Sequence, residues 1–149
     1  MDKKTMDPAK EFLKRYTTMS VRLKSLIASI DAAYDRMTKC TYTLNPIKVQ
    51  GGNGAYDRMA EDVAIRLDGI QMMQQECGAI NVALCEIMHA IQAVPDETAK
   101  AVLTLRYVEG LKWEDVCIKS HYEESQMHYY HRIGLRHVRK WLKDRSKSQ

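Results

Sequence analysis

Apolar side chains recur at helical spacing along two long stretches of the chain. In the first stretch the steps between them alternate between 4 and 3 residues, through Phe12, Tyr16, Met19, Leu23, Leu26, Ile30, Ala33 and Met37. The same rhythm returns in the second stretch at Met59, Val63, Arg66, Ile70, Met73, Cys77, Ile80, Leu84, Ile87 and Ile91. Alternating steps of 4 and 3 are typical of the seam of a coiled coil. The pattern therefore predicts two long helices, at about residues 8–39 and 57–93.

The connection between these helices, residues 45–55, contains one Pro and three Gly and cannot continue a helix. A loop of this length easily reverses the chain, so residues 1–94 are expected to form a long antiparallel hairpin. The charge supports this pairing, because residues 1–55 carry a net charge of +5 and residues 56–94 a net charge of −4. Individual surface ion pairs contribute little, so the apolar seam is expected to supply most of the stability.

Arg66 is the one charged member of the predicted seam. A buried arginine needs a partner, and Asp31 or Asp35 on the first helix could supply it.

The second helix also carries more apolar side chains than one seam uses, namely Ile65, Leu67, Met72 and Val82. Such a surplus predicts further helix packing, either by self-association or by docking on a larger protein. Gly69 and Gly78 lower the helix propensity and are expected where another helix approaches closely.

The last third of the chain, residues 95–149, predicts a separate unit of shorter helices. Pro95 ends the preceding helix, Asp96 is a favourable helix start, and Gly110 ends the helix that follows. A short helix is predicted over residues 112–119, then a turn, then a longer helix from about Glu124 to Lys143. Its inward stripe is predicted to be Met127, Tyr130, Gly134, Val138 and Trp141. The predicted fold class is all-α, a coiled-coil-like hairpin followed by a helix-turn-helix domain.

Residues of this last unit carry a family pattern: Arg106, Tyr107, Gly110, Trp113, Glu114, Val116, Tyr122, Met127, His131 and Leu135. The segment resembles region 4 of bacterial sigma factors. With the helical hairpin in front of it, the chain is similar to small phage and prophage transcription regulators of the late-gene type. Two positions depart from the pattern, since His121 stands where the family usually has Gly and Glu123 where it has Ser. The resemblance implies binding of double-stranded DNA in the major groove and contact with RNA polymerase.

One side of the predicted long helix presents side chains that can read or hold DNA. Residues 126–149 carry a net charge of +6, which suits a phosphate backbone. The predicted base-reading set is Glu124, Ser125, His128, Tyr129 and Arg132. The predicted phosphate-binding set is Arg106, Lys112, Arg136, Arg139 and Lys140. Glu124 could accept from a cytosine amino group, and acidic residues here also favour the positive end of the helix dipole. The alternative is a solvated basic face with no role in binding DNA.

The residues predict no catalytic, metal or cofactor site. No Gly-rich phosphate loop and no nucleophile with a neighbouring base emerges. The four cysteines form no CxxC pair, and His128 and His131 read as a helical surface pair without the further ligands that a metal needs. No apolar stretch reaches the length of a membrane span, so we expect a protein of the bacterial host's cytoplasm.

We therefore expect a non-enzymatic phage or prophage transcriptional regulator that forms a homodimer or a higher homo-oligomer. Two alternatives remain at this stage. One is a DNA-packaging protein of the small-terminase kind, which also joins a helix-turn-helix to an oligomerising helical part. The other is an adaptor that binds RNA polymerase and does not touch DNA.

Overall fold

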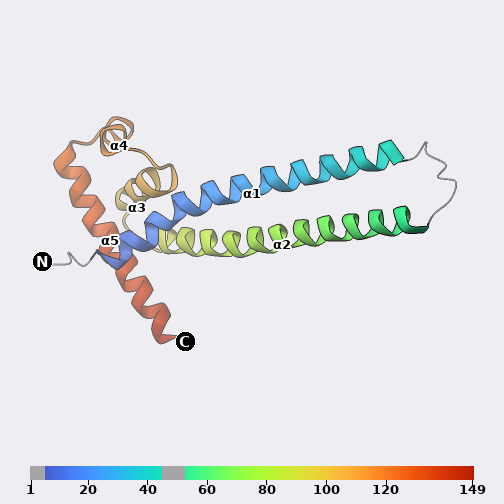
Figure 1. The fold of residues 1–149 in the computed structure, drawn as a ribbon. Helices are drawn as coiled ribbons and strands as arrows, with labels where there is room; N and C mark the ends of the chain where they lie inside the picture. The colour runs from blue at the N-terminus through green and yellow to red at the C-terminus, as the bar shows by residue number, and fades with distance from the viewer. Residues whose placement is uncertain (1–5, 45–52) are drawn as a thin grey trace, which may run out of the picture. The chain divides into compact units, whose positions relative to one another are not determined.

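A computed structural model describes residues 6–44 and 53–149, and for residues 40–44 and 53–56 it describes the backbone alone. Every element of this described part is helical, which confirms the all-α class (Figure 1). The elements are α1 (Pro8–Leu44), α2 (Asn53–Gln92), α3 (Glu97–Leu103), the π-helical turn η1 (Thr104–Val108), α4 (Trp113–Ser120) and α5 (Glu124–Lys147). Of the predicted loop 45–55, residues 45–52 lie outside the described residues and residues 53–55 belong to α2.

The chain divides into two compact units. Residues 21–81 form one, the hairpin unit. The other, the head unit, combines residues up to 20 with residues 82–149. The head unit therefore includes the start of α1 and the end of α2 as well as the predicted helix-turn-helix.

In the hairpin unit, α1 and α2 run in opposite directions (Figure 1). Arg22 of α1 forms an ion pair with Glu76 of α2 at 3.0 Å, and Gln74 of α2 donates to the Tyr34 hydroxyl at 3.5 Å. Of the predicted seam, Leu26 and Ile70 are almost fully buried in this unit. Burial of these apolar side chains contributes to the stability of the hairpin unit.

Arg66 corrects one expectation. It is exposed rather than buried, and it borders a surface hollow together with Arg36, Gly69 and Ile70. Val63, the preceding seam position, is also 41% exposed. A long arginine can lay its apolar stem along a seam while its charged end reaches outward, so the seam position does not force the charge inward.

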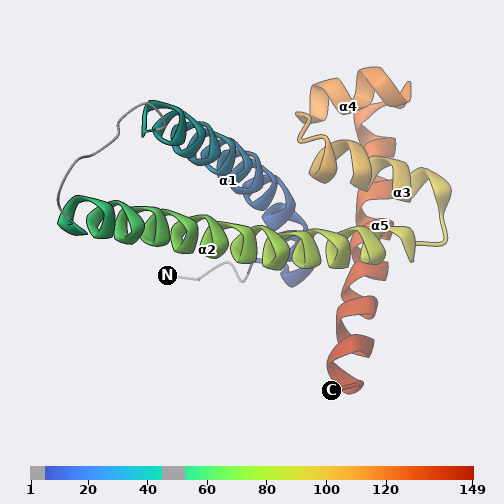
Figure 2. The same cartoon turned by 90° about the vertical axis from the view of Figure 1, so that its right-hand side faces the viewer.

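The head unit is built around a core to which both long helices contribute. Figure 2 shows the start of α1 and the end of α2 beside α5. The buried residues of this core are Ala9, Leu13, Ile87, Ala90, Ile91, Val94, Ala99, Leu103, Tyr107, Leu135 and Val138. Phe12 packs on Trp141 with ring centroids 5.9 Å apart, and Arg145 forms an ion pair with Glu86. Residues 95–149 thus share one core with the ends of α1 and α2.

The helices α3 and α5 pack closely against each other at Gly134, which is buried. A Cβ atom added there would lie 2.8 Å from the Cδ1 atom of Leu103. Real Cβ atoms are not found so close to a neighbour, so the absent side chain is what allows this contact. The glycine is a packing requirement of the head unit.

Helix boundaries in the head unit follow from local chemistry. The Asp96 carboxylate caps α3 by accepting from the N–H groups of Thr98 at 2.9 Å and Ala99 at 3.1 Å. After η1 the chain turns at Gly110, whose φ of 71° is the left-handed conformation that glycine adopts readily. The predictions for Asp96 and Gly110 are confirmed.

Candidate nucleic-acid interface

The helix α5 presents one buried and one exposed face. The buried face contains Met127, His131, Gly134, Leu135 and Val138. On the opposite face the exposed residues follow steps of 3, 4 or 1 residues: Ser125, Tyr129, Arg132, Arg136, Arg139 and Lys140, with the partly exposed His128 among them. The 3.6-residue period of a helix places all of these on one side. The structure therefore brings together seven of the ten predicted DNA-binding residues on one face of one helix.

Three cations of this face are open to a polyanion. Arg132, Arg136 and Lys140 are exposed and form no ion pair with any described residue. Arg139 is instead paired with Asp7 at 3.2 Å and is less available. Arg132, Arg136 and Lys140 therefore form the most strongly cationic part of the face.

The chain passes from α4 to α5 through three residues. His121 adopts the left-handed conformation, with φ 60° and ψ 26°, at the position where the resembled family usually has glycine. At the start of α5 the backbone N–H of Glu123 donates to the Gln126 Oε1 atom at 3.3 Å. Glu123 is the N-cap residue of α5, so its acidity suits the positive end of the helix dipole.

Glu124 lies in the first turn of α5 and is strongly exposed. Its Oε1 atom lies 3.6 Å from the His128 Nε2 atom, one helical turn further on. The His128 ring also packs against Trp113 of α4, with centroids 5.0 Å apart. Glu124 and His128 therefore form one polar cluster at the end of α5 that is closest to α4.

Arg106, predicted to contact phosphate, is partly buried within the head unit. Its guanidinium donates to the Leu111 carbonyl oxygen at 2.8 Å and lies over the Trp113 ring at 4.8 Å. These contacts hold the connection between η1 and α4 in place. Lys112 is exposed at the N-cap position of α4. A phosphate contact by either residue remains a prediction.

A buried polar pair that sequence reasoning missed lies behind this face. The Tyr107 hydroxyl lies 2.7 Å from the His131 Nε2 atom, and the His131 ring meets the Trp113 ring edge-on at 4.7 Å. Burial, with the nearby positive charges of Lys10, His128 and Arg106, lowers the pKa of His131 to about 4. Burial also raises the pKa of Tyr107 to about 12. Both groups are therefore neutral near pH 7 and share one hydrogen bond.

The interpretation of His128 and His131 as a pair of surface histidines was wrong for His131. The residue is 6% exposed, because it falls on the same side of α5 as the core residues Met127, Gly134 and Val138. The spacing 127–131–134–138, with steps of 4, 3 and 4, was the signal that could have identified it.

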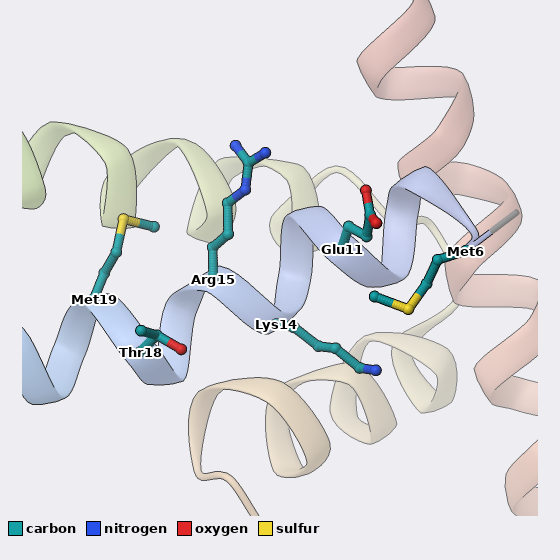
Figure 3. Close-up of a pocket in the computed structure, with 6 residues that line it drawn as sticks. All are labelled: Met6, Glu11, Lys14, Arg15, Thr18 and Met19. Atoms are coloured by element: carbon teal, nitrogen blue, oxygen red, sulfur yellow. The ribbon is translucent and has the colours of Figure 1, made fainter. Parts of the chain in front are cut away.

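The described residues contain no group of three or more His, Cys, Asp or Glu side chains placed to hold a metal ion. A shallow hollow on α1 is lined by Met6, Glu11, Lys14, Arg15, Thr18 and Met19. Figure 3 shows its charged side chains, among them Lys14 and Arg15, extending in different directions rather than converging on one point. None of the predicted DNA-binding residues lines this hollow.

Comparison of the chain with protein-family models, curated proteins and solved structures found no match. No helix in the described part of the chain combines the length and the apolar character that a bilayer-spanning segment needs.

Proposed function

We propose that this chain is a DNA-binding transcriptional regulator of the phage or prophage type, with a head unit that acts like sigma region 4. In this proposal α5 enters the major groove, where Ser125, His128, Tyr129 and Arg132 read base edges. Arg136 and Lys140 hold the phosphate backbone. The protein acts as a homo-oligomer and contacts RNA polymerase.

The observation that carries the proposal is the division of α5 into two faces. A helix that only packs a small domain has no need of a continuous exposed row of hydroxyl, imidazole, phenol and guanidinium groups. From Ser125 to Lys140 the row covers 16 residues, and the 15 steps between its ends correspond to about 22 Å at 1.5 Å per residue. That length and chemistry suit the major groove, which admits an α-helix and distinguishes bases by hydrogen bonding.

Two variants of α5 test the proposal through different physical effects. Arg132→Ala is expected to weaken binding to the selected site by about 1–3 kcal/mol and to relax the preference at one base position. Lys140→Ala is expected to weaken binding to all duplexes alike and to reduce the slope of log affinity against log salt by about one unit. The measurement is fluorescence anisotropy with duplexes selected from a random pool, at several salt concentrations.

The matched control is Arg58→Ala, which removes an exposed positive charge from α2 in the hairpin unit. It is expected to leave both the site preference and the salt slope unchanged. If the full-length protein shows no salt-dependent affinity for any duplex, the proposal fails and the polymerase-binding adaptor replaces it. A ring of eight or more subunits would instead favour the DNA-packaging alternative.

A further inference from the structure

In addition to its seam residues, α2 carries a row of residues without charged side chains. Its steps alternate between 4 and 3, as in the buried seam, and its members are Ala60, Ala64, Leu67, Gln71, Gln74, Gly78 and Asn81. We call these seven residues the neutral row. All seven are exposed. The charged residues of α2 between positions 57 and 81 all lie outside the row: Asp57, Arg58, Glu61, Asp62, Arg66, Asp68 and Glu76.

The neutral row is unusual for the flank of a two-helix hairpin. The residues that flank a coiled-coil seam are commonly Glu and Lys, which pair across the helices. The hairpin unit has such a pair on one flank, where Arg22 meets Glu76 at 3.0 Å. On the other flank the neutral row begins at an apolar hollow lined by Met59, Ala60, Val63, Ala64 and Leu67. The flank with Arg22 and Glu76 is thus suited to contact with water, and the flank with the neutral row is suited to contact with another protein surface.

We infer that the neutral row is the surface on which a second copy of this chain packs, with the two α2 helices antiparallel. When two copies of α2 lie antiparallel, the side-chain sizes along the neutral row of one copy complement those of the other. In the register centred between Gln71 and Gln74, Leu67 of one copy lies opposite Gly78 of the other. Ala64 likewise lies opposite Asn81, so larger residues meet smaller ones along the row.

The space at Gly78 supports this register. Apart from the adjacent residues and the backbone of α2 itself, a Cβ atom added to Gly78 would have no neighbour within 4 Å. Glycine inside a helix costs about 1 kcal/mol relative to alanine, and nothing within the single chain requires it there. Leu67, which is 46% exposed in one copy, fits over the missing side chain of the other copy.

Polar groups and charges favour the same arrangement. Amide side chains carry both donors and acceptors, so Gln71 of one copy can pair with Gln74 of the other. Gln74 also donates to the Tyr34 hydroxyl at 3.5 Å, and its amide has enough hydrogen-bonding groups for both contacts. Antiparallel packing separates the two copies of Asp68 by about 14 Å and the two copies of Glu61 by about 35 Å along the axis. Parallel packing would place each acid beside its own copy, which is unfavourable.

This inference deepens the homo-oligomer part of the proposed function and does not depend on DNA binding. The cross-linking and sedimentation tests can therefore fail while the DNA-binding tests succeed, and the reverse.

Disulfide cross-linking of the full chain tests the register. The four native cysteines are replaced by serine, and Ala64→Cys and Asn81→Cys are introduced singly and together. Positions 64 and 81 of one α2 helix are about 26 Å apart, which no disulfide within a chain can span. The double variant is expected to give covalent dimers after mild oxidation, and each single variant is expected to stay monomeric on a denaturing gel. Dimers of either single variant, or no dimer of the double variant, would overturn the antiparallel register.

Sedimentation velocity of the full chain tests whether the neutral row is the face of α2 that packs on the second copy. Leu67→Glu is expected to weaken self-association at least tenfold, whereas Ile65→Glu, at a 68% exposed position on another side of α2, is expected to leave it unchanged. Gly78→Leu is expected to weaken association similarly, and the double variant Leu67→Ala with Gly78→Leu to restore it, because the large and small partners are exchanged. Circular dichroism checks that each variant keeps its helix content. Equal effects of Leu67→Glu and Ile65→Glu, or a wild-type chain that stays monomeric at high concentration, would overturn the inference.

Discussion

Tyr107 and His131 form a polar contact inside an otherwise apolar core. Their hydrogen bond of 2.7 Å connects η1 to α5, and Trp113 of α4 covers the His131 ring. An unpaired polar group in such a place would be costly, so each residue satisfies the other. The pair fixes the position of α5 and therefore of the exposed residues on its opposite side.

This pair predicts how the stability of the head unit depends on pH. The pKa of His131 is about 4 in the folded protein and near 6.5 when the chain is unfolded. The unfolded chain therefore takes up a proton first, so the stability is complete above about pH 6.5 and is lost as the pH falls toward 4. We expect a loss of up to about 2 kcal/mol between pH 7.5 and pH 5. Urea unfolding at a series of pH values, monitored by tryptophan fluorescence, measures this loss of stability.

The comparison variants are His131→Gln and His89→Gln. His131→Gln is expected to be less stable at pH 7.5 and to show a smaller loss on acidification, because the titrating group is gone. His89→Gln changes an exposed histidine at the end of α2 and is expected to keep the pH-dependent loss that His131 causes. A wild-type profile that is flat between pH 7.5 and pH 5 would contradict the burial of a neutral His131.

Glu124 is the acidic residue of α5 next to the residues proposed to read base edges. Glu124→Ala is expected to raise the affinity for duplexes without the selected site, because a repulsive carboxylate is removed. Affinity for the selected site falls only if Glu124 accepts from a cytosine amino group. Anisotropy titrations with both kinds of duplex distinguish these outcomes. Glu124→Gln, which removes the charge and keeps an acceptor oxygen, is the companion variant.

At the scale of elements, the contact between α3 and α5 depends on Gly134. Gly134→Ala would place a Cβ atom 2.8 Å from the Leu103 side chain, which would have to shift within a filled core. We expect the free energy of unfolding to fall by about 1–3 kcal/mol, despite the better helix propensity of alanine. Thermal and urea unfolding measure the change.

Gly69→Ala is the matched control, because a Cβ at Gly69 would meet nothing within 4 Å. This substitution is expected to stabilise the hairpin unit by up to about 1 kcal/mol through helix propensity alone. The two glycine substitutions should therefore have opposite signs. A destabilising effect of the same size at both positions would show that close packing at Gly134 is not the cause.

At the scale of the whole molecule, the head unit is assembled from both ends of the chain. Leu13 of α1 and Ile87 and Ile91 of α2 are buried in the same core as Leu103 and Leu135. Leu13→Ala is expected to destabilise the head unit by about 2–5 kcal/mol, as for other fully buried leucines. Both tryptophans, Trp113 and Trp141, belong to the head unit, so their fluorescence during urea unfolding measures this directly.

The corresponding control is Val21→Ala, since Val21 is 64% exposed, and it is expected to change stability by less than about 0.5 kcal/mol.

The shared core of the head unit also predicts that a fragment of residues 95–149 alone does not unfold cooperatively, because it lacks the contacts of α1 and α2. A cooperative thermal transition of that fragment, with the stability of the full chain, would contradict this account of the core.

The sequence by itself determined the helical class, the positions of the helices and much of their inward faces. Helix formation follows local rules, so the steps of 4 and 3 residues and the signals at Pro95, Asp96 and Gly110 were sufficient to identify elements. The exposed side of α5 could be recognised for the same reason, since the spacing of residues 125–140 assigns them to one face whatever packs behind it.

Only the tertiary structure decided how those elements share a core. Periodicity identifies which face of a helix is buried but not what buries it, and the ends of α1 and α2 joined the head unit through contacts between residues far apart in the chain. Arg66 is exposed at a seam position, because a long side chain can extend out of a seam. The spacing in α5 marks the inward position of His131, but it does not show that Tyr107, 24 residues earlier, supplies the hydrogen bond that compensates for its burial. Pairings of this kind depend on three-dimensional proximity, which the linear pattern of the sequence does not contain.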